Sequence, residues 1–82
     1  MSHVPHELHE EFPEAAERLH ALKLSDAHFA RLADEYHTVN RQIHRIETRV
    51  EPASEETEQE LRRTRMRLKD EIAARLAQPE AA

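Results

Sequence analysis

The segment FARLADEYHTVNRQIHRIETRV, residues 29–50, carries an apolar side chain at every third or fourth position. These side chains belong to Phe29, Leu32, Tyr36, Val39, Ile43, Ile46 and Val50. Their spacing alternates between three and four, which is the heptad pattern of a helix that buries one stripe against another helix. A strand would need alternation at every second residue. Because Ser25 and Asp26 are good helix caps, we predict a helix over residues 26–50.

The next four residues, EPAS at 51–54, interrupt this helix. Pro52 cannot donate a backbone hydrogen bond and disfavours helical geometry at the residue before it. Ser54 can then cap a second helix whose first turn is rich in glutamate, as the helix dipole favours. We predict that this helix runs over residues 55–77 and ends before Pro79. Its apolar stripe consists of Leu61, Leu68, Ile72 and Leu76.

So short a connection makes the two long helices antiparallel neighbours. Upstream, Phe12, Leu19 and Leu22 again follow helical spacing, and Pro13 suits a first helical position, so a helix is expected over residues 13–22. The predicted fold is therefore all-α: an antiparallel, coiled-coil-like helical hairpin preceded by a short N-terminal helix. We expect one helical domain over residues 12–78, a mobile segment over residues 1–11 and a tail over residues 79–82. The arginines at positions 41, 45 and 49 are expected beside the acidic residues 56–60.

Composition excludes several classes of function. The chain has no glycine, and the loops that bind phosphates or dinucleotides require it. Both kinds of binding loop are therefore excluded. It has no cysteine, which excludes disulfides and thiolate metal sites. No apolar run approaches a membrane span, and the first residues do not resemble a signal peptide, so a cytoplasmic location is expected. Paired acids occur, but a hairpin offers no cleft to shift their pKa, so no catalytic residue, cofactor or small-molecule substrate is expected.

Several short motifs resemble the YdcH-like family of small bacterial helical-hairpin proteins of unknown function. They are HEEFPE at 9–14, LKLSDAHFARL at 22–32, DEYH at 34–37 and LKDEI at 68–72, together with Ile43 and Glu47. The likeness covers about residues 9–77. It implies a helical hairpin and supplies no established activity, substrate or cofactor. Asn40 stands where many members have Asp.

The seven histidines raise the hypothesis of a metal-handling protein. His3, His6 and His9 are three residues apart, which on a helix would place their imidazoles on one side, within reach of Zn²⁺ or Ni²⁺. However, Pro5 lies among them, and HELH at 6–9 is one residue short of the zinc-protease motif. We favour solvated surface histidines and predict no metal site.

A cluster of basic residues in the last predicted helix raises the hypothesis of a nucleic-acid-associated protein. It comprises Arg62, Arg63, Arg65, Arg67 and Lys69. These side chains are suited to contacts with phosphates. Three observations argue against this hypothesis. Successive residues on a helix point in different directions, so the five side chains do not form one patch. No aromatic residue lies among them for base stacking, and the net charge of the chain is -5. Nucleic-acid binding is therefore the alternative rather than the preferred hypothesis.

The preferred hypothesis follows from the small core. Two helices with one apolar stripe each bury little surface, so helix 13–22 or another chain must cover the open side. We expect a non-enzymatic protein–protein interaction or oligomerisation module that associates with itself or with another helical protein. The apolar stripes of the two long helices form the expected seam, and Tyr36 and Phe29 are the expected anchors.

Overall fold

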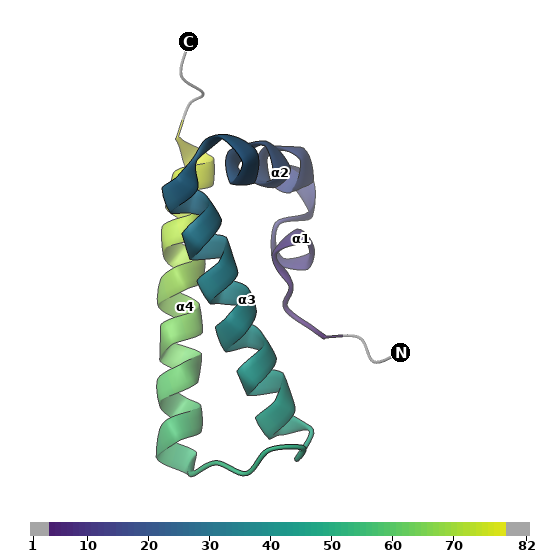
Figure 1. Cartoon of the computed structure of the whole chain (residues 1–82), viewed down its shortest axis with the longest axis vertical. Helices are drawn as coiled ribbons and strands as arrows, with labels where there is room; N and C mark the ends of the chain where they lie inside the picture. The colour runs from purple at the N-terminus through teal and green to yellow at the C-terminus, as the bar shows by residue number, and fades with distance from the viewer. Residues whose placement is uncertain (1–3, 79–82) are drawn as a thin grey trace.

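The computed structural model describes residues 4–78. Along the chain it forms the short helix α1 (Leu8–Glu11), the 3₁₀ turn η1 (Pro13–Ala15), and the helices α2 (Ala16–Ser25), α3 (Ala27–Glu47) and α4 (Glu55–Ala77). Helices α3 and α4 run antiparallel as a hairpin and diverge toward the loop that joins them (Figure 1). The all-α hairpin predicted from the heptad spacing is thus confirmed.

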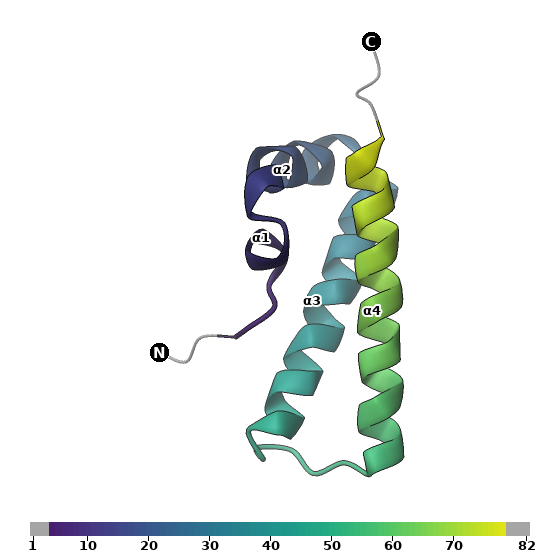
Figure 2. The ribbon, with the colours of Figure 1, turned by 180° about the vertical axis from the view of Figure 1, so that it is seen from behind.

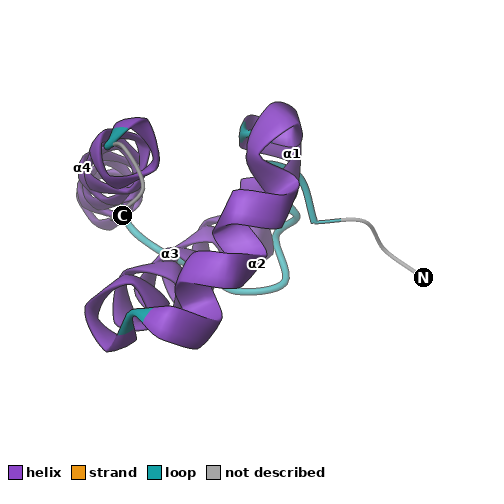
Figure 3. Cartoon of the chain, turned by 90° about the horizontal axis from the view of Figure 1, so that it is seen from above, coloured by secondary structure: helices purple, strands orange, loops and turns teal. Residues whose placement is uncertain are grey.

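The N-terminal part folds back onto the hairpin. Helix α2 crosses the end opposite the connecting loop, and the residues before it return alongside α3 (Figure 2). Seen along the hairpin, α2 passes over α3, with α4 to the left of the view and α1 to the right (Figure 3). Leu8 and Leu19 bury their side chains in the same core as Phe29 and Tyr36. We refer to residues 4–25 as the arm.

The arm differs from its prediction in two respects. Residues 4–11, which were expected to be mobile, lie against the hairpin, whereas residues 1–3 and 79–82 fall outside the described part of the chain. The single helix expected over 13–22 is divided into η1 and α2, and a further turn, α1, precedes them. That extra turn is stabilised by a capping box, in which the side chains of Glu7 and Glu10 each accept from the other's backbone N–H.

The buried stripe of α3 is rotated from the predicted one. Phe29, Ala33, Tyr36, Asn40 and Ile43 are buried, whereas Leu32 and Val39 are only half-buried. The predicted stripe assumed a single partner helix. The arm packs beside α4, so α3 buries the positions that face both elements.

Helix α3 also ends three residues before its predicted end. Arg49 adopts a left-handed conformation with φ 61, and the N–H groups of Arg49 and Val50 bond to the carbonyls of Ile46 and Arg45. These are the two bonds of a Schellman motif, which terminates the helix. Val50 consequently leaves the apolar stripe and is 73% exposed.

None of the described helices has the length and apolar character needed to span a bilayer.

Candidate functional site: the contact between arm and hairpin

Two side chains of α3 bind the main chain of the arm. The Tyr36 hydroxyl donates to the carbonyl oxygen of His6 at 2.6 Å, and the Asn40 amide nitrogen donates to that of Pro5 at 2.9 Å. Both donors belong to buried residues. His6 has the left-handed φ of 64, which is uncommon for a residue other than glycine, and the two hydrogen bonds stabilise this turn.

Asn40 also joins the arm to α4. Its amide oxygen accepts a hydrogen bond from the guanidinium of Arg65 at 2.9 Å. Asn40 is 1% exposed, and buried amides need hydrogen-bond partners. Its NH₂ group bonds to the arm, and its oxygen bonds to α4. Asn40 is therefore the residue at which all three parts of the fold are linked.

Charged contacts flank these hydrogen bonds. The imidazole Nδ1 of His37 lies 2.7 Å from a carboxylate oxygen of Glu7, and the Lys69 ammonium lies 2.9 Å from one of Glu11. The hydrogen bond from Lys69 holds the pKa of Glu11 below its ordinary value, against the opposing effect of burial. Two acidic residues of the arm, Glu7 and Glu11, thus face basic residues of the hairpin.

Between these polar contacts, Leu8 inserts an apolar side chain that is 2% exposed. Burial raises the pKa of Tyr36 to about 12, so its phenol remains a neutral donor at every physiological pH. We define the arm-binding site as Tyr36, His37 and Asn40 of α3 with Arg65 and Lys69 of α4. It offers two donors for main-chain carbonyls, space for one leucine and two partners for carboxylates.

The corner between α2 and α3 is held by Asp26. One carboxylate oxygen accepts from the backbone N–H groups of His28 and Phe29, at 3.0 and 3.1 Å. The other receives a charged hydrogen bond from Arg75 of α4, and this bond lowers the pKa of Asp26. Capping and the ion pair together fix the direction in which the arm leaves the hairpin.

The predicted seam residues are distributed unevenly. Phe29, Tyr36, Ile43, Ile46, Leu68 and Ile72 are buried, Leu32, Val39, Leu61 and Leu76 are intermediate, and Val50 is exposed. Most of the seam is thus used inside the chain, between the two long helices and the arm.

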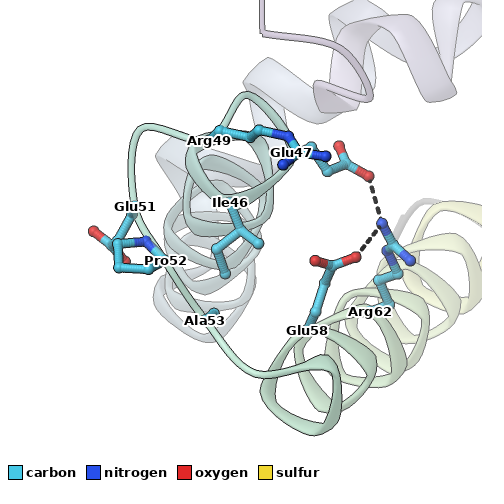
Figure 4. A pocket seen from close by; sticks show the side chains of 8 residues that line it. All are labelled: Ile46, Glu47, Arg49, Glu51, Pro52, Ala53, Glu58 and Arg62. Carbon is cyan, nitrogen blue, oxygen red and sulfur yellow. Dashed lines mark hydrogen bonds and ion pairs between the residues drawn. The ribbon is translucent and has the colours of Figure 1, made fainter.

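The five basic residues of α4 do not form one surface. Arg62 bonds to Glu47 and Glu58 at 2.8 Å each, at the open end of the hairpin beside the loop (Figure 4). Arg65 and Lys69 belong to the arm-binding site. The remaining two, Arg63 and Arg67, are exposed, and Arg67 pairs with Glu71 in the next turn.

The structure also locates an arginine near the connecting loop and two histidines of the arm. The arginines at positions 41, 45 and 49 were expected beside residues 56–60, but Arg45 pairs with Glu51 of the connecting loop at 3.6 Å. Helices α3 and α4 diverge toward this loop (Figure 1). Of the proposed metal ligands, His3 lies outside the described residues, His6 lies 3.5 Å from Glu11, and His9 is exposed. Within residues 4–78, no three histidine or acidic side chains converge in a way that could hold a metal ion.

The two long helices match a described protein family. A family model described as "Protein of unknown function (DUF465)" matches residues 29–76, which is more than half of the chain and includes nearly all of α3, the loop and nearly all of α4. No curated protein and no solved structure shows a significant match. The match contains every residue of the arm-binding site and none of the arm. The chain therefore belongs to the DUF465 family of unknown function, which is the YdcH-like family that its motifs resemble.

Proposed function

We propose that the protein is a non-enzymatic interaction module whose hairpin binds a short, acidic, leucine-bearing segment. One observation carries this proposal: the arm-binding site already holds such a segment, from the same chain, by contacts of the kind used between proteins. Tyr36 and Asn40 bond to carbonyl oxygens rather than to side chains. The long helices supply the rigid frame that positions these donors.

The contacts divide into two kinds, as they do in peptide recognition. The bonds to the carbonyls of Pro5 and His6 require only an available main chain. The burial of Leu8 and the ion pairs of Glu7 and Glu11 depend on the sequence of the segment. Main-chain bonds contribute affinity and orientation, whereas the leucine and the carboxylates contribute selectivity.

The nucleic-acid hypothesis is less well supported by the geometry. Arg62, Arg65 and Lys69 are engaged by acceptors of the same chain. A polyanion would have to displace those acceptors, and the pair left exposed, Arg63 and Arg67, is a small surface for counterion release.

The test opens the site without altering it. Leu8→Asp places a charge where the leucine is buried and should detach the arm, while the hairpin keeps all five residues of its site. We expect a fluorescent peptide with the sequence of residues 4–12 to bind this variant saturably, as measured by anisotropy. The intact chain should bind the peptide at least tenfold more weakly, because its own arm occupies the site at high effective concentration.

Two controls and one alternative variant define the result. His9→Asp changes the exposed neighbour of Leu8 and should leave the site closed. Adding Tyr36→Phe and Asn40→Ala to Leu8→Asp should abolish binding of the peptide. If Leu8→Asp disturbs the helical circular dichroism, the double substitution Glu7→Lys with Glu11→Lys opens the site by charge alone. Absence of saturable binding to a helical, open variant would refute the proposal.

A further inference from the structure

The apolar stripe of α2 is in phase with that of α3. Leu19 and Leu22 line the buried side of α2, and Phe29 begins the buried side of α3, seven residues after Leu22. Ala33 and Tyr36 follow at the next helical spacings. If the two helices were one, these side chains would form a single uninterrupted stripe. Asp26 would be its only charged member between Leu19 and Tyr36.

The corner that separates the two helices contains no residue that requires a bend. A single residue, Asp26, leaves helical geometry, with φ -132 and ψ 105. The chain has no glycine, and its prolines lie at 5, 13, 52 and 79, outside the whole of α2 and α3. The bend is therefore maintained by contacts of the Asp26 side chain and not by the local backbone.

The hydrogen bonds of the corner nearly balance those of a straight helix. Straightening removes the two cap bonds to Asp26 and its ion pair with Arg75. It allows the N–H groups of residues 27, 28 and 29 to bond to the carbonyls four residues earlier. The bonds from Asp26 to Leu22 and from Ala30 to Asp26 already exist and are kept. The two forms thus differ chiefly in the position of the arm.

We propose that the arm is exchanged between two copies of this chain, with α2 and α3 joined into one helix and each arm seated in the arm-binding site of the other copy. This inference rests on the proposed function and names a second copy as the partner. Every contact that the arm makes within one chain is available between two identical chains. Leu24, which is 77% exposed at the corner, would lie on the segments where the two chains pass each other.

The ion pair between Lys69 and Glu11 provides the test, because its atoms are 2.9 Å apart and a carbodiimide can join them as an amide. Heavy-isotope-labelled and unlabelled chains are mixed, unfolded, refolded together at millimolar concentration and separated by size. Each fraction is cross-linked, digested and examined by mass spectrometry. Equal amounts of the two chains pair at random, so half of the dimers contain one labelled and one unlabelled chain. We therefore expect about half of the Lys69–Glu11 cross-links in the dimer to join a labelled to an unlabelled peptide. In the monomer, both peptides of each cross-link should carry the same isotope.

Substitution of the corner gives the second measurement. Asp26→Ala removes the cap and the ion pair and should raise the dimer association constant at least tenfold, measured by light scattering. Arg75→Gln removes only the ion pair and should raise it less, and Asp34→Ala, an exposed aspartate on α3, should leave it unchanged. A dimer with only single-isotope cross-links, or no dimer even for Asp26→Ala, would overturn the exchange. Peptide binding by the opened variant would be unaffected by that outcome.

Discussion

The Tyr36 hydroxyl lies 2.6 Å from the carbonyl oxygen of His6, a residue thirty positions earlier in the chain. This contact fixes a segment outside the family match to the centre of α3, which lies inside it. Tyr36 is the only tyrosine in a chain without tryptophan, so its fluorescence reports directly on whether the arm is in place.

Tyr36→Phe should loosen the arm while leaving the hairpin folded. The substitution keeps the buried ring and removes one hydrogen bond, so we expect a loss of about 1 kcal/mol in the free energy of unfolding. Amide exchange should accelerate over residues 7–12 and stay slow in the middle of α4. Thr38→Val, on the exposed side of the same helix, is the control. Equal acceleration in arm and hairpin would show that the hydroxyl serves the whole fold and not the arm.

Asn40→Asp should separate the two functions of the buried amide. A carboxylate still accepts from Arg65, so the contact between α3 and α4 is kept. It cannot donate to the carbonyl of Pro5 and repels it, which should weaken attachment of the arm by about 1–3 kcal/mol. Chemical shift changes in nuclear magnetic resonance spectra should therefore concentrate in the arm. Asn40→Ala, which loses both contacts, should perturb α4 as well; identical spectra for the two variants would contradict this division.

Arg49→Gly should stabilise the protein. The Cβ atom of a residue in left-handed geometry costs about 1–2 kcal/mol, and glycine removes this cost. The greater freedom of glycine in the unfolded chain offsets part of the gain, so a net increase of about 0.5–1 kcal/mol is expected. Urea denaturation measures it. Arg49→Ala removes the same charge but keeps Cβ, and it should give no such increase.

The stability of the fold should fall at acidic pH. Contacts with Lys69 and Arg75 lower the pKa of Glu11 and of Asp26 from ordinary values of 4.5 and 3.8. A carboxyl group with a lowered pKa stabilises the folded state above its ordinary pKa and loses this effect as pH falls through the lowered value. Thermal unfolding should therefore shift to lower temperature below about pH 4.5. Glu11→Gln and Asp26→Asn should each reduce the fall in unfolding temperature at acidic pH. If the double variant showed the same fall as the original chain, Glu11 and Asp26 would not be its cause.

The hairpin could be predicted because its causes are local. The heptad from Phe29 to Ile46, the break at Pro52 and the cap at Ser54 act over a few residues, and each is visible in the sequence. The end of α3 could not be predicted in the same way. An arginine takes the left-handed position at which glycine is usual, so the sequence contains no signal for it.

The arm-binding site could be predicted only in part. A buried tyrosine needs a partner for its hydroxyl, but the partner of Tyr36 is a main-chain carbonyl, and every residue has one. The heptad spacing does not tell whether Asn40 is buried. An amide next to the apolar stripe is either buried with hydrogen-bond partners or exposed at the surface. Choosing between these requires knowing that the arm returns to α3, which depends on contacts between distant parts of the chain.

Attachment of the arm through carbonyl oxygens has a consequence for the sequence that the arm requires. The side chains at positions 5 and 6 do not provide the bonded atoms, so a replacement that preserves the left-handed turn at position 6 leaves both hydrogen bonds in place. The sequence requirements of the leading segment then concern Leu8, Glu7, Glu11 and the turn at His6, whereas all five residues that hold the segment lie within the family match. The two sides of this intramolecular contact therefore differ in how strongly they depend on the identity of their side chains.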